Sequence, residues 1–273
     1  MRLSRFVMLS LGTVAMIACS SGEKVTSPSL PSLSVVRFIN ALSDTGGVDI
    51  RAVDQVEFSP VANNLAYRAG TVYFDTQAGV RHFRVFPTSR DINVTSKVMA
   101  DASVTLPEST RLTLLLTGSA RAGTVNLWVI DDGTTPPPDG QVGVRLVNAA
   151  PGVVNGYLVN TVTTALPAAA TFSSIGTLIR SPYVNRAVGV AAIRVTDAGS
   201  STVNASAVGP AAPVILTGEK PAAGVTSSGT MFSAYYFGPG AAGSPNASVT
   251  TPSLIWFVDR NPCDVPAVPA CTP

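Results

Sequence analysis

The side chain best suited to acid–base chemistry in this sequence is His82, the only histidine of 273 residues. A catalytic imidazole needs a nucleophile and an orienting acid beside it, and no sequence feature marks either partner. The G-x-S-x-G and H-E-x-x-H motifs are also absent. Because His82 lies in a strand-like segment beside Arg81 and Arg84, we interpret it as a solvated surface residue. We therefore predict that the chain is not an enzyme; a hydrolase is the weakest alternative.

Carboxylates gather at two predicted strand ends, where they could bind Ca²⁺. Asp131-Asp132-Gly133 is one such segment, and Asp44 or Asp49 could complete a site with it. Calcium takes about six to eight oxygen ligands, however, and the D-x-D-x-D-G spacing is absent. A turn that ends a strand is the simpler interpretation, and it extends to Asp259-Arg260-Asn261-Pro262. The sequence predicts no metal and no other cofactor.

Aromatic residues offer a possible sugar-stacking platform. Trp128 and Trp256 each lie in an apolar strand, so a buried position is the simpler interpretation for both. Tyr235, Tyr236 and Phe237 precede a Gly/Pro/Ala-rich loop and are the better candidates for an exposed patch that contacts a ligand. A carbohydrate-binding surface module is therefore the main alternative function.

The N-terminus has the features of an export signal. Two arginines precede an apolar run over residues 6–18 that is too short to span a bilayer. The run ends in Met16-Ile17-Ala18-Cys19, which resembles the lipobox of bacterial lipoproteins with Met16 in place of the usual Leu. The resemblance implies cleavage before Cys19 and a diacylglycerol on its thiol. An ordinary signal peptide with an incidental cysteine is the alternative.

The residues after Cys19 bear on the location of the protein. Ser20 follows the cysteine, and by the same resemblance the absence of Asp there implies transfer to the outer membrane, with its facing left open. The Ser/Pro-rich residues that follow predict a flexible tether. Cys263 and Cys271 form an even pair in an exported chain, which predicts a disulfide in the Pro-rich tail.

Composition limits the class of partner. Charged residues are 12% of the chain, about half of the usual share of roughly 25%. Without Arg2 and Arg5, which belong to the predicted signal peptide, 16 basic residues face 16 acidic ones. No basic block remains, so no nucleic-acid partner is predicted.

The remaining sequence predicts two copies of one β-rich unit. Val36–Ala41 (VRFINA) returns 108 residues later as Val144–Ala149 (VRLVNA). Further segments match in the same order, with Arg84 and Arg194 in register: residues 79–85 with 189–195, 114–118 with 214–218, and 127–131 with 255–259. Each copy holds about seven short alternating strands, typical of an immunoglobulin-like antiparallel β-sandwich; a small antiparallel barrel is the alternative.

The predicted organisation is therefore all-β. Arg37 and Arg145, like the other paired arginines, are interpreted as outward residues that cover apolar neighbours with their stems. The three prolines of the linker predict a stiff spacer between the two domains. The segments are a lipoprotein signal peptide 1–18, a tether 19–34, a sandwich domain 35–133, a Pro-rich linker 134–140, a second sandwich domain 141–261 and a Pro-rich tail 262–273.

The opening of each copy resembles a known bacterial family. The pattern V-R-[FL]-[IV]-N-A followed by V-[DN] is similar to the domain of unknown function 4397, with Asn40 and Asn148 at the usual His. The resemblance implies a β-sandwich and export, and it brings no catalytic residues. We predict a lipid-anchored cell-envelope protein that acts as a non-catalytic binding or structural module, with the membrane and an unidentified protein or glycan as partners.

Overall fold

The computed structural model describes residues 30–55, 61–133, 135–211 and 223–262. Cys19, Cys263 and Cys271 lie outside these residues, so the predicted lipidation and disulfide stay predictions. The described residues from Pro31 onward form one compact unit. Within the described part of the chain, no helix has the length and apolarity that crossing a membrane would require.

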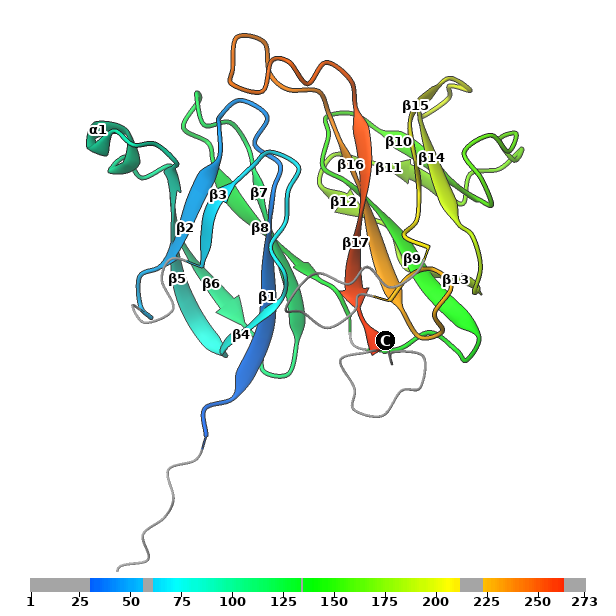
Figure 1. Ribbon diagram of the computed structural model, residues 1–273, viewed down its shortest axis with the longest axis horizontal. Coiled ribbons are helices and arrows are strands. Elements are labelled where there is room, and N and C mark those ends of the chain that lie inside the picture. Colours follow the sequence, from blue (N-terminus) through cyan, green and yellow to red (C-terminus); the bar gives the residue numbers. More distant parts are fainter. Residues whose placement is uncertain (1–29, 56–60, 134, 212–222, 263–273) are drawn as a thin grey trace, which may run out of the picture. The chain divides into compact units, whose positions relative to one another are not determined.

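The first half of this unit is built from strands with one short helix, α1 (Ile92–Thr95) (Figure 1). Its strands are β1 Leu33–Asn40, β2 Val48–Ala52, β3 Ala62–Leu65, β4 Phe74–Gln77, β5 Gly79–Pro87, β6 Ala100–Leu106, β7 Arg111–Thr117 and β8 Asn126–Asp131. They form two four-stranded sheets, ordered β4-β1-β7-β8 and β3-β2-β5-β6.

The second half repeats this arrangement. Its strands are β9 Gln141–Asn148, β10 Val154–Val159, β11 Phe172–Ile175, β12 Ile179–Arg180, β13 Val184–Ala187, β14 Ala192–Asp197, β15 Val203–Val208, β16 Met231–Phe237 and β17 Ser253–Arg260. One sheet is ordered β11-β10-β14-β15, and the other is ordered β12-β9-β16-β17 with β13 also pairing with β9. The prediction of an all-β chain is therefore confirmed, as four small sheets.

The expectation that the sheets are purely antiparallel is wrong. β1 pairs with β7 in parallel, and β9 pairs with β16 in parallel. In each half the chain leaves the first strand, builds the other sheet and returns beside the first strand in the same direction. A parallel neighbour requires a long connection of this kind. The domain boundaries predicted at 35–133 and 141–261 stay a prediction.

Each half has its own apolar core between its two sheets. In β1 the side chains of Val36 and Phe38 are fully buried on one face, where they meet Ile50 and Val85 of the facing sheet. Strand alternation explains this pattern, because every second side chain points to the same face. The second half has an equivalent core around Val144 and the strands that face it.

The two halves also share a core with each other. The sheets that contain β1 and β9 face each other and bury Ile39, Leu115, Ile130, Val147, Tyr235 and Phe237. Residues 135–140 therefore do not hold the halves apart, and the interpretation of the linker as a spacer is wrong. Side chains from both halves pack together in one shared core.

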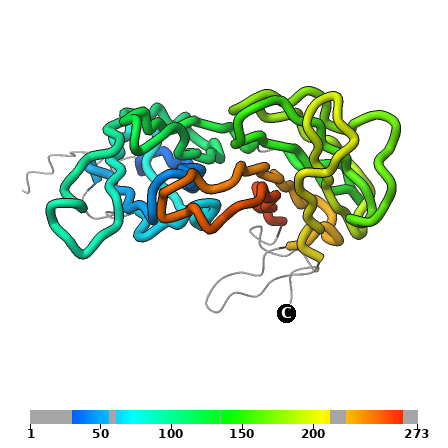
Figure 2. The backbone as a smooth tube through the Cα atoms, turned by 90° about the horizontal axis from the view of Figure 1, so that it is seen from above, coloured from blue at the N-terminus to red at the C-terminus, as the bar shows by residue number. Residues whose placement is uncertain are grey.

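The segment between β16 and β17 extends this contact, and Figure 2 shows it in orange beside the first half. The Ala241 amide donates to the Ser43 carbonyl at 3.0 Å, and Arg121 Nη1 donates to the Ala242 carbonyl at 2.9 Å. The Asn246 amide group donates to the Thr45 carbonyl at 2.5 Å. The loop predicted at residues 238–246 thus binds the first half of the same chain.

Candidate functional site

Among the described residues, the buried charged side chains other than Asp44 gather between the halves, and two of them are arginines. Arg37 of β1 and Arg145 of β9 alternate with the core-facing residues, so both point into the shared interface. Their exposed fractions are 2% and 0%. The interpretation of these arginines as outward surface residues is therefore wrong. A guanidinium at such a depth requires charge partners and a full set of hydrogen-bond acceptors.

Arg37 obtains these partners from both halves. Its Nε donates to the Thr113 hydroxyl at 2.7 Å, and its Nη1 donates to the Val258 carbonyl at 2.8 Å. Its Nη2 forms an ion pair with Asp259 of the second half. The guanidinium carbon also lies 4.6 Å from the centre of the Tyr73 ring, which is cation–π geometry.

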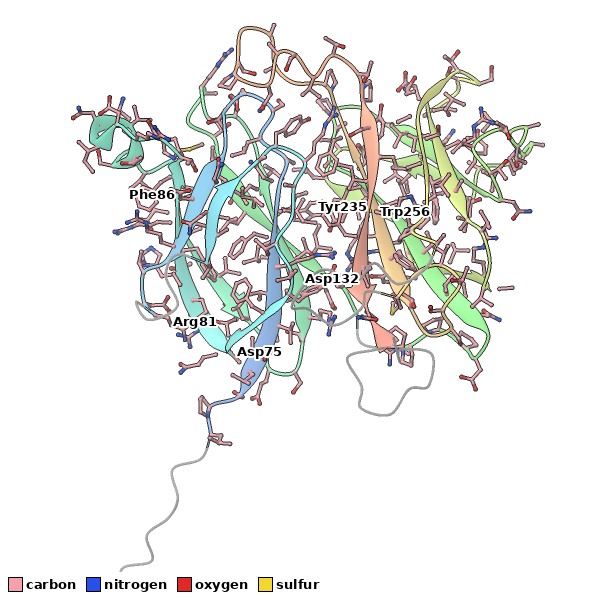
Figure 3. All side chains as sticks on the ribbon, viewed as in Figure 1. Asp75, Arg81, Phe86, Asp132, Tyr235 and Trp256 are labelled. Carbon is pink, nitrogen blue, oxygen red and sulfur yellow. The ribbon has the colours of Figure 1, made fainter. Side chains whose placement is uncertain are left out.

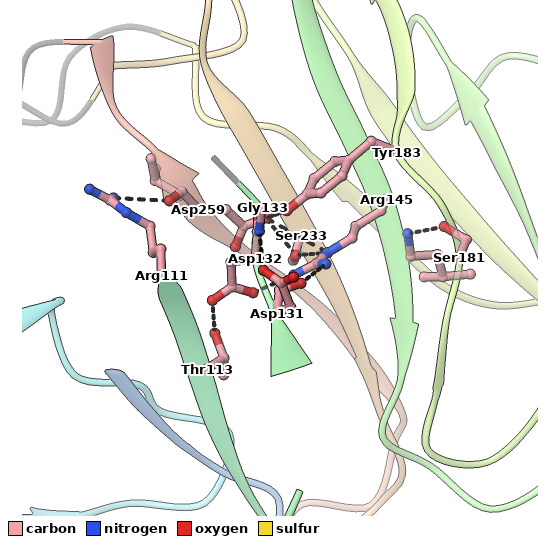
Figure 4. A network of polar contacts seen from close by, with 12 residues as sticks. Arg111, Thr113, Asp131, Asp132, Gly133, Arg145, Ser181, Tyr183, Ser233 and Asp259 are labelled. Atoms are coloured by element: carbon pink, nitrogen blue, oxygen red, sulfur yellow. Dashed lines mark hydrogen bonds and ion pairs between the residues drawn. The ribbon is translucent and has the colours of Figure 1, made fainter. Parts of the chain in front are cut away.

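Arg145 of the second half makes the equivalent contacts, with its ion-pair partner in the first half. Its Nε donates to the Ser233 hydroxyl at 2.6 Å, and its Nη1 donates to the Asp131 carbonyl at 2.8 Å. Its Nη2 forms an ion pair with Asp132 of the first half (Figure 4). Its guanidinium carbon lies 4.5 Å from the centre of the Tyr183 ring. Each half therefore supplies the arginine for the other half's aspartate.

The remaining carboxylate oxygens are also occupied. Asp132 Oδ2 accepts hydrogen bonds from the hydroxyls of Thr113 and Tyr73, both at 2.6 Å. Asp259 Oδ2 accepts from the hydroxyls of Ser233 at 2.5 Å and Tyr183 at 2.7 Å. Figure 4 shows one side of this network of two arginines and two aspartates, whose formal charges cancel.

Burial sets the electrostatics of the network. Burial would lower the pKa of Arg37, but Tyr73, Asp259 and Asp132 raise it well above its ordinary value. Burial raises the pKa of the Tyr73 hydroxyl far above its ordinary value, and it raises the pKa of Tyr183 as well. The arginines thus stay charged and the tyrosines stay protonated at neutral pH. The arrangement favours a fixed set of hydrogen bonds over proton transfer, and its ion pairs run between the two halves.

The aromatic residues predicted to contact a ligand belong to this interior. Tyr235, which Figure 3 labels, and Phe237 are fully buried between the halves. Tyr236 is buried in the core of the second half. The expectation of an exposed aromatic patch at these residues is wrong. It failed because β16 is covered on both faces, so alternation cannot bring any of the three side chains to the surface. The carbohydrate-binding alternative loses the residues on which it depended.

His82 lies on the outer face of the β3-β2-β5-β6 sheet, with 35% of its side chain exposed. It pairs with Asp101, which also accepts a hydrogen bond from Arg84 Nε at 2.8 Å. An acidic neighbour is therefore present. The exposed cluster differs from the enclosed pocket that a hydrolase mechanism would require.

The carboxylates considered for calcium lie apart and have other partners. Asp44 accepts hydrogen bonds from the Ser119 hydroxyl at 2.6 Å and from two backbone amides at 3.0 Å, and it orders the turn after β7. Asp49 accepts from the Asn64 amide at 2.8 Å, while Asp132 belongs to the ionic network. Among the described residues, no three His, Cys, Asp or Glu side chains group as a metal site would need.

A hollow of about 270 Å³ opens beside the ionic network. Its lining residues are Gly133, Thr135, Pro136, Pro137, Tyr183, Asn185 and Met231. Tyr183 is the only titratable group among them, and its hydroxyl already donates to Asp259. The hollow could therefore contact a ligand through the Tyr183 ring, but its lining residues supply no free group for acid–base chemistry.

The sequence interpretation assigned Asp132 and Asp259 to strand-ending turns, and it did not recognise them as equivalent because it aligned the last strands with an error of one residue. Thr113 pairs with Ile130, and its counterpart Ser233 pairs with Phe257. Ile130 and Phe257 are therefore equivalent, which makes Asp132, and not Asp131, the counterpart of Asp259. One step along a strand exchanges its faces. The two tryptophans accordingly differ: Trp128 packs at the interface between halves and Trp256 packs against the second core.

Comparisons with known proteins find a family that part of this chain matches. Residues 34–155 match the family DUF4397, a domain of unknown function. The match corresponds to one such domain, and it spans the first half, β9 and the start of β10. No curated protein matches the chain.

Solved structures resemble the chain only distantly. A leucine-rich repeat protein from Bacteroides thetaiotaomicron shares 12% identity over 66% of this chain, with a TM-score of 0.20, and the chain spans only 24% of that protein. A family CBM26 module from Eubacterium rectale Amy13K, solved in complex with maltoheptaose, shares 8% identity over 85% of this chain and 99% of its own, with a TM-score of 0.23. An alpha-glucan-binding streptococcal virulence factor shares 16% identity over 62% of this chain and 83% of its own, with a TM-score of 0.19. These scores are too low to carry a functional argument.

Proposed function

We propose that this chain is a lipid-anchored cell-envelope protein that acts as a non-catalytic binding or structural module. Its body would consist of two tandem immunoglobulin-like β-sandwich domains of the DUF4397 type. One observation carries the proposal: Arg37, Asp132, Arg145 and Asp259, the charged residues gathered in the interior, are engaged with one another across the halves. Their partners are structural, which favours a rigid body that contacts its partner through outer faces and loops.

The protein would act by presenting its folded body to a partner near the membrane surface. A lipid on Cys19 would fix the protein to the outer membrane, because two or three acyl chains bind a bilayer almost permanently. Residues 19–34 would give the body a reach of about 50 Å at full extension. The shared core and the reciprocal ion pairs would then present both halves to a protein or glycan partner as one unit.

Metabolic labelling with an alkyne fatty acid tests the anchor. The full chain is expected to incorporate the label and to fractionate with the outer membrane, whereas Cys19→Ala should lose the label and leave the membrane. Equal labelling of the Cys19→Ala chain would refute the anchor. Protease treatment of intact and lysed cells then reports the facing: loss from intact cells indicates an external partner, and survival until lysis indicates a periplasmic one.

A test of the binding role follows from the same cells. Photo-crosslinking residues placed on outer strand faces are expected to capture a partner, while one placed at a position in the shared core should not. The absence of any crosslinked product from all outer positions would contradict a binding role and leave a purely structural one.

A further inference from the structure

The contacts between the two halves do not depend on both halves belonging to one chain. Arg37 pairs with Asp259 and Arg145 pairs with Asp132, so both ion pairs cross from one half to the other. The apolar residues of the shared core also come from both halves. The first half of one copy would therefore meet the second half of another copy with the same partners. The connection between β8 and β9 decides whether the halves that meet belong to one chain.

This connection is a proline segment with a glycine at each end. Pro136, Pro137 and Pro138 fix φ and favour an extended backbone at the residue before each of them. Gly133 and Gly140 have φ of +70° and +72°, which are left-handed values that favour glycine. The prolines therefore form a stiff segment, and the chain changes direction at the two glycines.

The turn at Gly140 belongs to the second half. The Gln141 amide donates to the Pro138 carbonyl at 3.1 Å, and the Val188 amide donates to the Gly140 carbonyl at 3.0 Å. The Gly140 amide donates to the Ser228 hydroxyl at 2.8 Å. These bonds do not involve the first half, so this turn would stay intact if the two halves of one chain separated.

Gly133 lies at the other end, where the chain leaves the first half (Figure 4 labels this residue). Its amide donates to the Asp131 carboxylate at 2.8 Å, which is a bond within the first half. Beyond it, Pro136 and Pro137 line the hollow of about 270 Å³ together with Tyr183 of the second half. Because the hollow leaves these prolines incompletely packed, Gly133 is the position at which the connection separates most easily from the second half.

We propose that two copies of this chain exchange halves, so that the first half of each copy packs against the second half of the other. Glycine changes its φ at little steric cost, so rotation at Gly133 releases the prolines from the hollow while the contacts between first and second halves form again. The stretch from Gly133 to Pro138 then spans about 15 Å in polyproline geometry and connects the two folded bodies of the dimer. The partner is a second copy of this chain, and the dimer presents each outer face twice. This inference goes beyond the proposed function and does not depend on the anchor or on a ligand.

Two glycine substitutions test the role of Gly133. A Cβ at Gly133 meets nothing closer than 3.9 Å, and a Cβ at Gly140 meets nothing within 4 Å, so neither change to alanine causes a clash. A left-handed φ disfavours alanine by roughly tenfold, and exchange removes this cost at Gly133 but keeps it at Gly140. Gly133→Ala is therefore expected to raise the dimerisation constant of the full chain by about tenfold or more. Gly140→Ala is the matched control and should leave that constant unchanged.

The measurement is native mass spectrometry of the full chain in detergent, after unfolding in urea and refolding over a range of protein concentrations. The wild type should form a dimer at high concentration. This dimer should persist on dilution, because a return to the monomer requires the shared core to open.

A pair of charge-reversed variants distinguishes exchange from a contact between outer faces. Arg37→Asp and Asp259→Arg each bring like charges together between the halves of a closed monomer. If the two variants exchange halves when refolded together, one interface of the heterodimer is wild-type and the other has the reversed pair. We expect a heterodimer whose midpoint of urea unfolding is higher than that of either variant alone. Folded protein obtained only from the mixture would support exchange even where neither variant folds by itself.

Three results would each overturn the proposal. The first is a wild-type chain that stays monomeric at every concentration, and the second is equal dimerisation of Gly133→Ala and Gly140→Ala. The third is a charge-reversed mixture that contains no heterodimer. Together with a dimeric wild type, this third result would assign the dimer contact to an outer face.

Discussion

Replacing Arg37 with Met removes the positive charge that faces Asp259 inside the interface between the halves. Both side chains are almost completely buried, at 2% and 0% exposure. Breaking a buried ion pair by removing one partner destabilises a protein by roughly 3–5 kcal/mol, because the other charge is left without compensation. Asp259 would keep its hydrogen bonds from Ser233 and Tyr183 and would still lie 3.9 Å from Arg145. The lower end of the range, about 3 kcal/mol, is therefore expected.

A double-mutant cycle separates the ion pair from its surroundings. Arg37→Met and Asp259→Asn are each expected to lower the free energy of unfolding in urea. The double variant should lose about 1–3 kcal/mol less than the two single losses combined, because residues in one network do not act independently. Arg84→Met is the matched control: it breaks the exposed pair with Asp101, so it should cost only about 0–1 kcal/mol.

The same urea curves test whether the network holds the halves together. The wild type should unfold in one transition, whereas Arg37→Met should let the two halves unfold separately or at a lower midpoint. Losses below about 1 kcal/mol for both single variants, or additivity within about 0.5 kcal/mol, would refute the argument. The network would then be an ordered feature of the interface that contributes little to the free energy of unfolding.

Three further predictions follow from other features. The Tyr235 hydroxyl is buried and has no hydrogen-bond partner among the described residues. Tyr235→Phe should therefore leave stability unchanged or raise it by up to about 1–3 kcal/mol in urea unfolding, while Tyr183→Phe should lower it. Destabilisation by Tyr235→Phe would show that the hydroxyl has a partner. Burial alone would raise the pKa of Asp44, but hydrogen bonds from Ser119 and two amides lower it, so its carboxylate stabilises the fold above the unfolded pKa of about 3.9 and loses that effect as the pH falls through the folded pKa. Asp44→Asn should therefore lose less stability than the wild type between neutral pH and roughly pH 3, and an unchanged pH dependence would contradict this assignment. A Cβ on Gly156 would lie 2.7 Å from Leu146 Cδ2 and 3.0 Å from Phe172 Cδ2, so Gly156→Ala should cost about 1–3 kcal/mol, compared with little for Gly46→Ala, which meets nothing within 4 Å.

Local patterns in the sequence are sufficient to predict several strands of the first half. They predict strands over residues 35–41, 48–53, 80–86 and 111–117, and these correspond to β1, β2, β5 and β7. Alternation and β-branched residues determine these segments locally, so tertiary context does not override them. The expected match of residues 114–118 with 214–218 failed for a different reason. β7 pairs with β1 as β16 pairs with β9, so Met231–Phe237 is the true counterpart of β7.

The ionic network could not be predicted, because its members become neighbours only through long-range pairing. Arg37 and Asp259 are 222 residues apart, and their contact depends on which sheet faces of the two halves meet. A sequence signal did exist: a low share of charged residues makes an arginine repeated on two apolar strands unusual. Matching that arginine with a repeated aspartate required the correct alignment of the last strands. An error of one residue placed the acid on the wrong face.

The reciprocity of the network raises the question of what keeps each half from pairing with its own copy. Each half supplies an arginine on its first strand, a hydroxyl on the neighbouring strand and an aspartate at the end of its last strand (Asp259) or directly after it (Asp132). By charge alone either half would therefore also fit a copy of itself. Two unmatched features break this equivalence. Leu115 of one half corresponds to the bulkier Tyr235 of the other, because they hold the same register positions. The segment between β16 and β17 also binds Ser43, Thr45 and Arg121 of the first half, whereas the turn after β7 is short and folds around Asp44. The ion pairs therefore select which sheet faces pack together. The segment between β16 and β17, which has no equivalent in the first half, favours packing of the first half against the second over packing of a half against its own copy.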